Sequence, residues 1–385
     1  MPYAWIMTTR GHLATLTAAV IFSSLGINGA APGQAEGAEY RLVEVENPVF
    51  HENELFVSHE DLRSPRFNDL IQRYEIGKVV GNETNEFKRI LLLRNWIKRN
   101  IAIENVNPTP TRGDAFGIVD AALKGGGFHC GHFMVVQNAV LNAFGYVTRC
   151  LGVGPGGTPE RPGGHHGVNE VWSNEYLKWV LIDAKYDTHF ERDGIPLSAL
   201  EVRDELLRNG ASDITCVRGP DRLPVEGPEE PEGGPVTYRW LSWEIQGDRH
   251  SNWPQFHSSA LVTYPDEYYR THKWWRQGRT NQHWAYAAGF FIPTPHREWI
   301  EWTPNVLQVT ASINQGNVQG LIVSSTPNLK EYQVCERPGT EWLPLTPHFS
   351  FQLTQDRHEW HLRSVNLVGV PGPTYRLIAE RAPTE

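Results

Sequence analysis

Cys130 stands between a run of three glycines and a segment whose apolar residues recur at helical spacing. That segment ends at Gly145, a typical left-handed helix terminator, and its apolar residues are Phe133, Met134, Val136, Val140, Leu141 and Phe144. Because these residues cover most of the circumference, we expect a buried helix that begins at Cys130. The unpaired amides and the positive dipole end of a helix lower the pKa of a thiol placed there. The pattern therefore predicts a sulfur nucleophile, and the alternative is a buried structural cysteine.

A second pair of chemical groups is predicted by the strand–turn–strand pattern that follows this helix. With the turn centred between Asn174 and Glu175, His166 lies directly opposite Asp183, and His165 points to the other face. Directly opposed residues have β-carbons about 4.5–5.5 Å apart, although a one-residue slip in register would separate them. A thiolate needs a proton acceptor, and the acceptor needs an orienting group. The hairpin offers His166 and Asp183 for these tasks, and the alternative is a hairpin without a chemical role.

The combination of Cys130 at a helix start, His166 in an H-x-x-N-E-V strand and Asp183 at the end of the next strand resembles the transglutaminase-like superfamily. The sequence Asn-Glu-Val-Trp-Ser-Asn-Glu-Tyr, followed by Trp-Val-Leu-Ile-Asp-Ala, is similar to exported bacterial members in particular. The resemblance covers roughly residues 85–210. Members commonly have an aromatic residue two positions after the histidine, where this chain has Val168. The resemblance implies a papain-like core with a Cys-His-Asp triad.

The same resemblance implies a role for each of the three residues. Cys130 would attack a carboxamide or peptide carbonyl, His166 would hold the proton and return it to the leaving amine, and Asp183 would fix the imidazole tautomer. The backbone amide of Cys130 is expected to donate to the oxyanion because it opens a helix. A second oxyanion donor is usual in such enzymes, and the sequence does not identify it. No cofactor is expected.

An alternative use of this part of the chain is a metal site, for which the potential ligands are His129, Cys130, His132, His165, His166, Asp187 and His189. No pair of them has the C-x-x-C or H-E-x-x-H spacing that makes a metal prediction strong. We therefore expect cysteine chemistry and no metal.

Glu170 is a further carboxylate on the predicted face of His166. A buried carboxylate needs a partner. Arg149 and Lys185 are the candidates for this partner.

Several segments must position these groups. Gly and Pro dominate residues 152–164, which predicts a loop beside His166 that shapes access to the site. Four helices are also expected: a short one near 67–74, an amphipathic one over 82–101 capped by Thr84, one over 114–123, and one that starts at Ser198 with a capping box to Glu201 and ends at Asn209-Gly210.

The length of 385 residues predicts two or three domains, and the hydrophobic content of 40% is sufficient for large cores. The net charge is −9 and the pI is near 6.0. Because nucleic-acid binding needs a basic surface, these values argue against nucleic acid as a partner.

Residues 1–35 have the features of an export signal. Arg10 and His12 precede an apolar run over 13–27, and small residues follow it. The run is shorter than the ~20 apolar residues of a transmembrane helix, and an uncleaved anchor is the alternative. We expect a periplasmic, cell-surface or secreted protein with no integral membrane segment after signal removal.

The chain has four cysteines. If Cys130 is a free nucleophile, then Cys150, Cys216 and Cys335 form an odd set that allows at most one disulfide. A bridge from Cys150 to Cys216 is the expected pairing, and the absence of any disulfide is the alternative.

The carboxy-terminal third divides into two regions. Residues 237–302 are unusually aromatic, and six of the chain's 14 tryptophans are Trp253, Trp274, Trp275, Trp284, Trp299 and Trp302 of this region. We favour a second core layer over a substrate surface because large aromatics dominate core energetics. Short alternating strands then predict a small all-β sandwich.

The sequence thus predicts an α+β protein with a signal peptide at 1–35, a transglutaminase-like catalytic domain with an aromatic-rich extension at 39–302, and a β-sandwich at 303–385. The expected function is that of an exported cysteine-dependent acyl-transfer enzyme. It would act on peptide or carboxamide bonds through a thioester, with hydrolysis favoured. The alternatives are a protein-glutamine transglutaminase that cross-links and a non-catalytic module for cell-wall or polysaccharide ligands. The expected partner is a protein, peptide or glycopeptide substrate.

Overall fold

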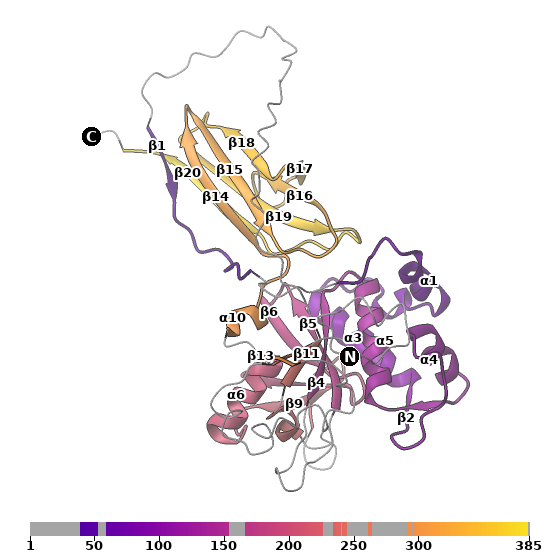
Figure 1. Cartoon of the computed structure of the whole chain (residues 1–385). Coiled ribbons are helices and arrows are strands. Elements are labelled where there is room, and N and C mark those ends of the chain that lie inside the picture. Colours follow the sequence, from indigo (N-terminus) through magenta and orange to yellow (C-terminus); the bar gives the residue numbers. More distant parts are fainter. Residues whose placement is uncertain are drawn as a thin grey trace, which may run out of the picture. The chain divides into compact units, whose positions relative to one another are not determined.

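Helices and strands are both abundant in the chain, and its fold class is α+β, which confirms the prediction (Figure 1). The computed structural model describes residues 39–52, 59–153, 166–225, 234–239, 241–244, 261–263, 291–293 and 296–383. The expected export signal, His165, most of the predicted loop over 152–164, and Trp253, Trp274, Trp275 and Trp284 of the aromatic region lie outside these residues.

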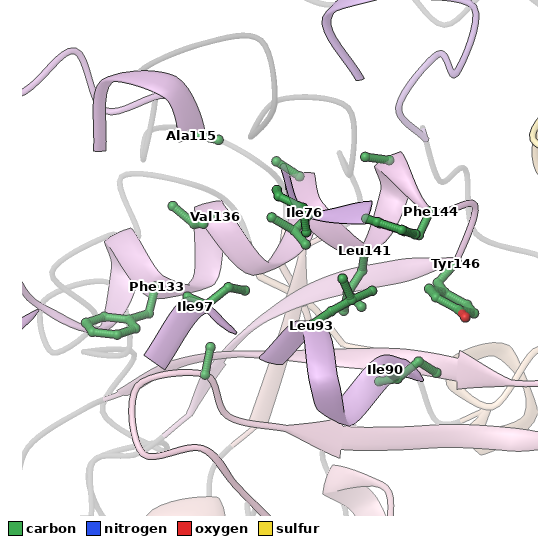
Figure 2. Close-up of a cluster of buried hydrophobic side chains, with 14 of the residues drawn as sticks. Ile76, Ile90, Leu93, Ile97, Ala115, Phe133, Val136, Leu141, Phe144 and Tyr146 are labelled. Carbon is green, nitrogen blue, oxygen red and sulfur yellow. The ribbon is translucent and has the colours of Figure 1, made fainter. Parts of the chain in front are cut away.

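A helical layer precedes the main sheet and shares one buried apolar core (Figure 2). Side chains such as Ile90 and Ile97 meet Val136 and Leu141 in this core. The helices are α1 (Pro65–Arg73), α2 (Gly77–Val80), α3 (Glu86–Asn100), α4 (Ala115–Ala122) and α5 (Cys130–Ala143).

Helix α5 has the environment that its apolar circumference predicts. All of its residues are buried, and Gly145 follows it with a left-handed φ of 82°. Helix α3 differs in one detail from the prediction, because Asn85 caps it instead of Thr84. The Lys88 amide donates to the Asn85 side chain at 2.7 Å, which satisfies an amide left unpaired at the helix start.

The main sheet has six strands in the order β13-β12-β11-β4-β5-β6. Helix α5 packs on one face, where the Asn169 side chain donates to the Met134 carbonyl at 3.3 Å and Gln137 donates to the Ile182 carbonyl at 3.1 Å. The strands are β4 (Thr148–Val153), β5 (His166–Ser173), β6 (Lys178–Ile182), β11 (Leu241–Glu244), β12 (Leu261–Thr263) and β13 (Phe291–Pro293).

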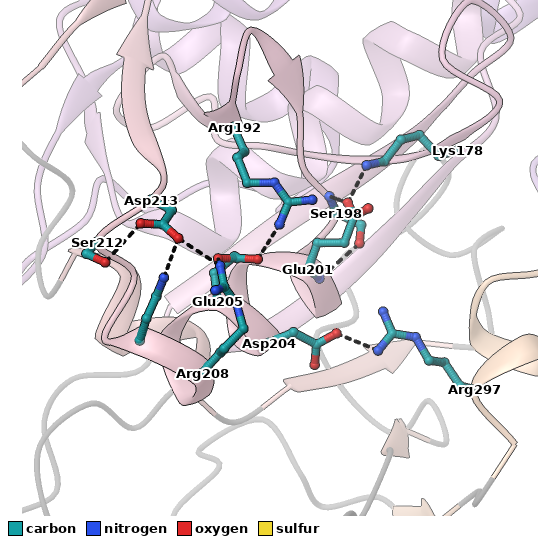
Figure 3. A network of polar contacts seen from close by, with 11 residues as sticks. Lys178, Arg192, Ser198, Glu201, Asp204, Glu205, Arg208, Ser212, Asp213 and Arg297 are labelled. Atoms are coloured by element: carbon teal, nitrogen blue, oxygen red, sulfur yellow. Dashed lines mark hydrogen bonds and ion pairs between the residues drawn. The ribbon is translucent and has the colours of Figure 1, made fainter.

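The other face of the main sheet carries a second apolar core that includes Val168 and Leu181. Helix α6 (Ala199–Asn209) contributes to this core and begins with the predicted capping box of Ser198 and Glu201. Its polar side forms ion pairs with Lys178, Arg192 and Arg297 of neighbouring elements (Figure 3).

Smaller elements complete this part of the chain. A four-stranded sheet has the order β10-β9-β7-β8, and a parallel pair joins β2 to β3. Their bounds, with those of two short helices, are β2 (Ala102–Ile103), β3 (Gly127–Phe128), β7 (Thr188–Arg192), β8 (Ile195–Pro196), β9 (Thr215–Arg218), β10 (Leu223–Pro224), η2 (Gly234–Arg239) and α10 (Arg297–Ile300).

The β5–β6 hairpin is two residues out of its predicted register. Trp172 lies opposite Trp179 instead of Leu177, because the turn has four residues, 174–177, instead of two. Side chains alternate with a period of two, so a shift of two keeps each residue on its predicted face. Extending the observed register puts Asp183 opposite Val168, diagonal to His166. The prediction of direct opposition was therefore wrong.

Two sheets form a sandwich around a third apolar core that includes Trp360, Leu362 and Leu377. Their orders are β14-β15-β18 and β1-β20-β19-β16-β17, and β1 (Tyr40–Val43) enters from the other end of the chain. The remaining strands are β14 (Leu307–Asn314), β15 (Asn317–Ser324), β16 (Leu329–Cys335), β17 (Leu343–Leu345), β18 (His348–Gln352), β19 (Arg357–Asn366) and β20 (Tyr375–Arg381).

All four cysteines are buried and none forms a disulfide, so the expected bridge from Cys150 to Cys216 was wrong. Cys150 lies on β4 of the main sheet, and Cys216 lies on β9 of the four-stranded sheet. The bridge was expected because both cysteines were thought to lie near the catalytic core, but they lie on strands of two different sheets.

Trp302, from the described part of the aromatic region, is buried against Trp172 and Trp179. Its carbonyl accepts a hydrogen bond from the Trp179 indole at 2.8 Å.

Within the described ranges, no helix combines the length and apolar character that crossing a bilayer requires.

Candidate active site

Cys130 is the first residue of α5 and is 7% exposed. His129 caps the helix, and its Nδ1 accepts a hydrogen bond from the Gly131 amide at 3.2 Å. The cap leaves the Cys130 amide without an intrahelical acceptor, as at the start of any α-helix. The sulfur therefore lies where the helix dipole and backbone amides favour negative charge.

His166 and Asp183 form a buried pair beside this helix end. The His166 Nε2 lies 2.7 Å from Asp183 Oδ2, and the two residues are 8% and 3% exposed. Asp183 Oδ1 accepts the amides of Lys185 at 2.8 Å and Tyr186 at 3.3 Å. Because the carboxylate accepts from Nε2, Nδ1 is the ring nitrogen available to Cys130.

The pKa of Cys130 is lowered to about 4. Burial opposes ionisation of the thiol, but hydrogen bonds from His129 and His166, the charge of His166 and the Gly167 amide together outweigh it. His166 thus lowers the pKa of the Cys130 thiol both as a hydrogen-bond partner and as a positive charge.

The pKa of His166 moves in the opposite direction, to about 10. Burial lowers it, while the charge and hydrogen bond of Asp183 and the contact with Cys130 raise it by more. Burial likewise raises the pKa of Asp183, but His166 and the two turn amides bring it below its ordinary value. The result is a buried thiolate–imidazolium pair with a carboxylate behind it.

His132 lies two residues after Cys130 on α5 and packs against two neighbouring rings. Its ring centroid lies 4.1 Å from that of His129 and 5.0 Å from that of Phe128. Burial and the neighbouring His129 lower its pKa to about 4, which keeps the ring neutral at physiological pH.

Glu170 is fully buried, and its partner is Arg149. The Arg149 Nε donates to Glu170 Oε2 at 2.7 Å, and the Ala199 amide donates to Oε1 at 2.7 Å. Lys185, the other candidate, lies in the turn after Asp183.

The described residues contain no group of three or more His, Cys, Asp or Glu side chains arranged to hold a metal ion. Asp187 and His189, two of the potential ligands, contact the buried Arg94 instead. His165, another of them, is outside the described residues.

The sequence model of the transglutaminase-like superfamily matches residues 76–184. This match includes α5, β5 and β6, and with them all three residues of the buried chain of contacts. The chain carries a transglutaminase-like domain. The match supports a general cysteine-enzyme kind for residues 76–184.

Among solved structures, the chain is similar to one from Parabacteroides distasonis that is described as a proposed protease. The identity is 11% and the TM-score is 0.23, over 83% of this chain and 57% of that chain. The chain thus spans little more than half the length of that protein. No curated protein matches.

Gly167 and Tyr186 lie beside the His166 ring or the start of α5, although sequence reasoning did not select them. A β-carbon on Gly167 would lie 3.4 Å from the Met134 sulfur and 3.6 Å from the Gly131 Cα, which is ordinary van der Waals contact, so β5 lies directly against the start of α5 at this residue. The Tyr186 ring lies 5.7 Å from the His166 ring. The position of Gly167 directly after His166 in the sequence could have indicated that it lies at the site. The position of Tyr186 depends on the shape of the turn after Asp183, and no sequence pattern indicated it.

Proposed function

We propose that the transglutaminase-like domain is a cysteine-dependent acyl-transfer enzyme that hydrolyses peptide or carboxamide bonds through a thioester on Cys130. The observation that supports this most directly is the buried chain of contacts from the Cys130 sulfur through His166 to Asp183. Substrates would be proteins, peptides or glycopeptides.

In the first half of the reaction, the Cys130 thiolate attacks the carbonyl carbon, and the carbonyl electron pair moves to oxygen. The Cys130 amide donates to that oxyanion. As the oxyanion collapses, the C–N bond breaks, and the proton on His166 passes to the departing nitrogen. The products of this half are a free amine and an acyl thioester.

In the second half, neutral His166 takes a proton from water while the water oxygen attacks the thioester carbonyl. The C–S bond breaks, the acid leaves, and the thiolate–imidazolium pair forms again. Asp183 stabilises the imidazolium at both stages without itself taking up the proton. An amine in place of water would give a cross-linked product.

The test is activity profiling of the wild type and Cys130→Ala on a peptide and glycopeptide library, with and without an amine probe. We expect cleavage or deamidation by the wild type, little amine incorporation, and no turnover by the variant. Dominant amine incorporation would replace hydrolysis with cross-linking. Equal signals from wild type and variant would contradict the whole proposal.

We also propose that the protein is exported. The support is the sequence of residues 1–35, with Arg10 and His12 before the apolar run. Mass spectrometry of protein recovered outside the cytoplasm should give an amino terminus near residue 32 or 36, after the small-residue sites. An intact amino terminus in the cytoplasmic fraction alone would contradict export.

A further inference from the structure

Asp183 begins a tight turn whose shape decides where its carboxylate points. Its amide donates to the Thr188 carbonyl at 2.9 Å, and the Thr188 amide donates back at 3.0 Å, which closes the turn over residues 184–187. The amides of Lys185 and Tyr186, inside that turn, donate to the Asp183 carboxylate. Any change in the turn would therefore change the contacts of the group that faces His166.

The turn contains a residue in an unfavourable conformation. Asp187 has a φ of 59°, in the left-handed region that most L side chains avoid. The side chain of Asp187 is held by two residues of α3. Arg94 Nε donates to Oδ1 at 2.8 Å, and Asn95 Nδ2 donates to Oδ2 at 2.5 Å.

Arg94 joins this turn to two further segments. Its guanidinium lies 2.9 Å from His189 Nδ1 on β7 and donates to the Gly219 carbonyl at 3.3 Å. The Gly219 amide donates to the Asp187 carbonyl at 3.0 Å. Arg94 is fully buried, so its planar fork fixes three neighbouring segments at one point.

We propose that Arg94 and Asp187 are positioning residues that hold the 184–187 turn so that Asp183 faces His166. Asp183 and Asp187 stand at the two ends of one turn, one facing His166 and the other facing Arg94. A buried ion pair is weak as a source of stability, because apolar residues of the same volume often serve as well. The role of the Arg94–Asp187 pair is to fix the conformation of the turn. This inference rests on the proposed function of the triad.

The test is the pH dependence of Cys130 alkylation by iodoacetamide, followed by mass spectrometry of the Cys130 peptide, together with thermal unfolding. We expect Asp187→Ala and Arg94→Met to move the alkylation midpoint upward by about one pH unit or more, because His166 loses a correctly placed carboxylate. Asp187→Asn keeps an acceptor and tolerates the left-handed conformation, so it should shift the midpoint less than Asp187→Ala. Arg94→Lys, which keeps the charge but loses the fork, should fall between wild type and Arg94→Met.

The matched control is Ile118→Ala, a core truncation on α4 that lowers the melting temperature without touching the network. It should leave the alkylation midpoint at the wild-type value. A midpoint that stays unchanged in all four network variants while their melting temperatures fall would overturn the positioning role alone. An ordinary thiol midpoint near 8.5 in the wild type would instead overturn the proposed function, and this inference with it. Should the two severe variants not fold, Asp187→Asn and Arg94→Lys decide between these outcomes.

Discussion

The ionisation of Cys130 and His166 results from opposed influences of comparable size. Burial alone would keep both side chains neutral, whereas their mutual contact and the Asp183 carboxylate charge them. The pKa of Cys130 lies near 4 and that of His166 near 10, so the ion pair is the main form between these values. Above pH 10 the imidazolium loses its proton, and with it the ability to protonate a leaving amine.

Asp183→Asn tests this balance at a single residue. The variant keeps the size of the side chain but removes the charge that holds the pKa of His166 high, so the alkaline limit of activity should move down from near pH 10. We expect kcat to fall on the order of 10³–10⁴-fold, as when the carboxylate of a catalytic triad is neutralised. The measurement is a pH–rate profile on whichever peptide substrate the library identifies.

Asp213→Asn is the control for that experiment, since Asp213 forms an exposed pair with Arg208 away from the site. Its profile should match the wild type. If the alkaline limit of Asp183→Asn also stays in place, the carboxylate does not govern His166.

Strands β4 and β5 and helix α6 meet at the buried ion pair of Arg149 and Glu170. Glu170→Ala would leave the Arg149 charge buried without its carboxylate, and removing one member of such a pair costs about 3–5 kcal/mol. Urea unfolding should show this loss. Asp213→Ala, which breaks an exposed pair, should cost about 0–1 kcal/mol. Equal losses of unfolding free energy in both variants would mean that the buried pair contributes no more to stability than the exposed pair.

Strand β7 should make folding stability depend on pH through His189. Burial lowers the pKa of His189 to about 4, against the Glu191 hydrogen bond that raises it, while Arg94 and Arg222 add to the lowering. The unfolded chain takes up a proton near pH 6.5 that the folded chain refuses until about pH 4. Stability should therefore fall as the pH drops through this window.

Thermal unfolding between pH 7 and pH 4 measures that slope, and His189→Gln should reduce it because glutamine does not titrate. His132, whose pKa is also lowered to about 4, titrates in the same range, remains in the variant and supplies a background. An identical slope in wild type and variant would show that His189 is not the source.

The elements differ in how well local sequence predicts them. The capping box of Ser198 and Glu201 and the helix after Cys130 depend on neighbouring residues, so the sequence predicted both. The predicted pairing of His166 with Asp183 was correct although the predicted hairpin register was wrong. A four-residue turn in place of a two-residue turn shifts the register by two residues, and a shift of two keeps each side chain on its predicted face of the sheet. The separation of Cys150 from Cys216 and the contact of Arg94 with Asp187 depend on how separate sheets and helices pack, and the spacing of residues in the sequence does not reveal that packing.

At the scale of the whole molecule, β1 joins the sandwich by pairing with β20, with Leu42 opposite Ala379. Leu42 packs against the sandwich core, and its neighbour Arg41 is exposed. We expect Leu42→Asp to lower the free energy of unfolding by about 2 kcal/mol, since a charge replaces apolar contact. Arg41→Asp on the opposite face of the strand should change it by less than about 0.5 kcal/mol, and urea unfolding compares the two. Similar values for both would mean that β1 adds no apolar packing to the sandwich.

Tyr40 and Arg381 are paired across β1 and β20 although they stand 341 positions apart, 381 minus 40. During synthesis, β1 is made long before β20, so it lacks this partner until the chain has been extended through β20. A chain that stopped short of β20 would leave the β1 edge without this partner, whatever the state of the segments in between. A circular permutant that links β20 directly to β1 would place the two paired strands next to each other in sequence, so the strands of the sandwich would form one continuous segment.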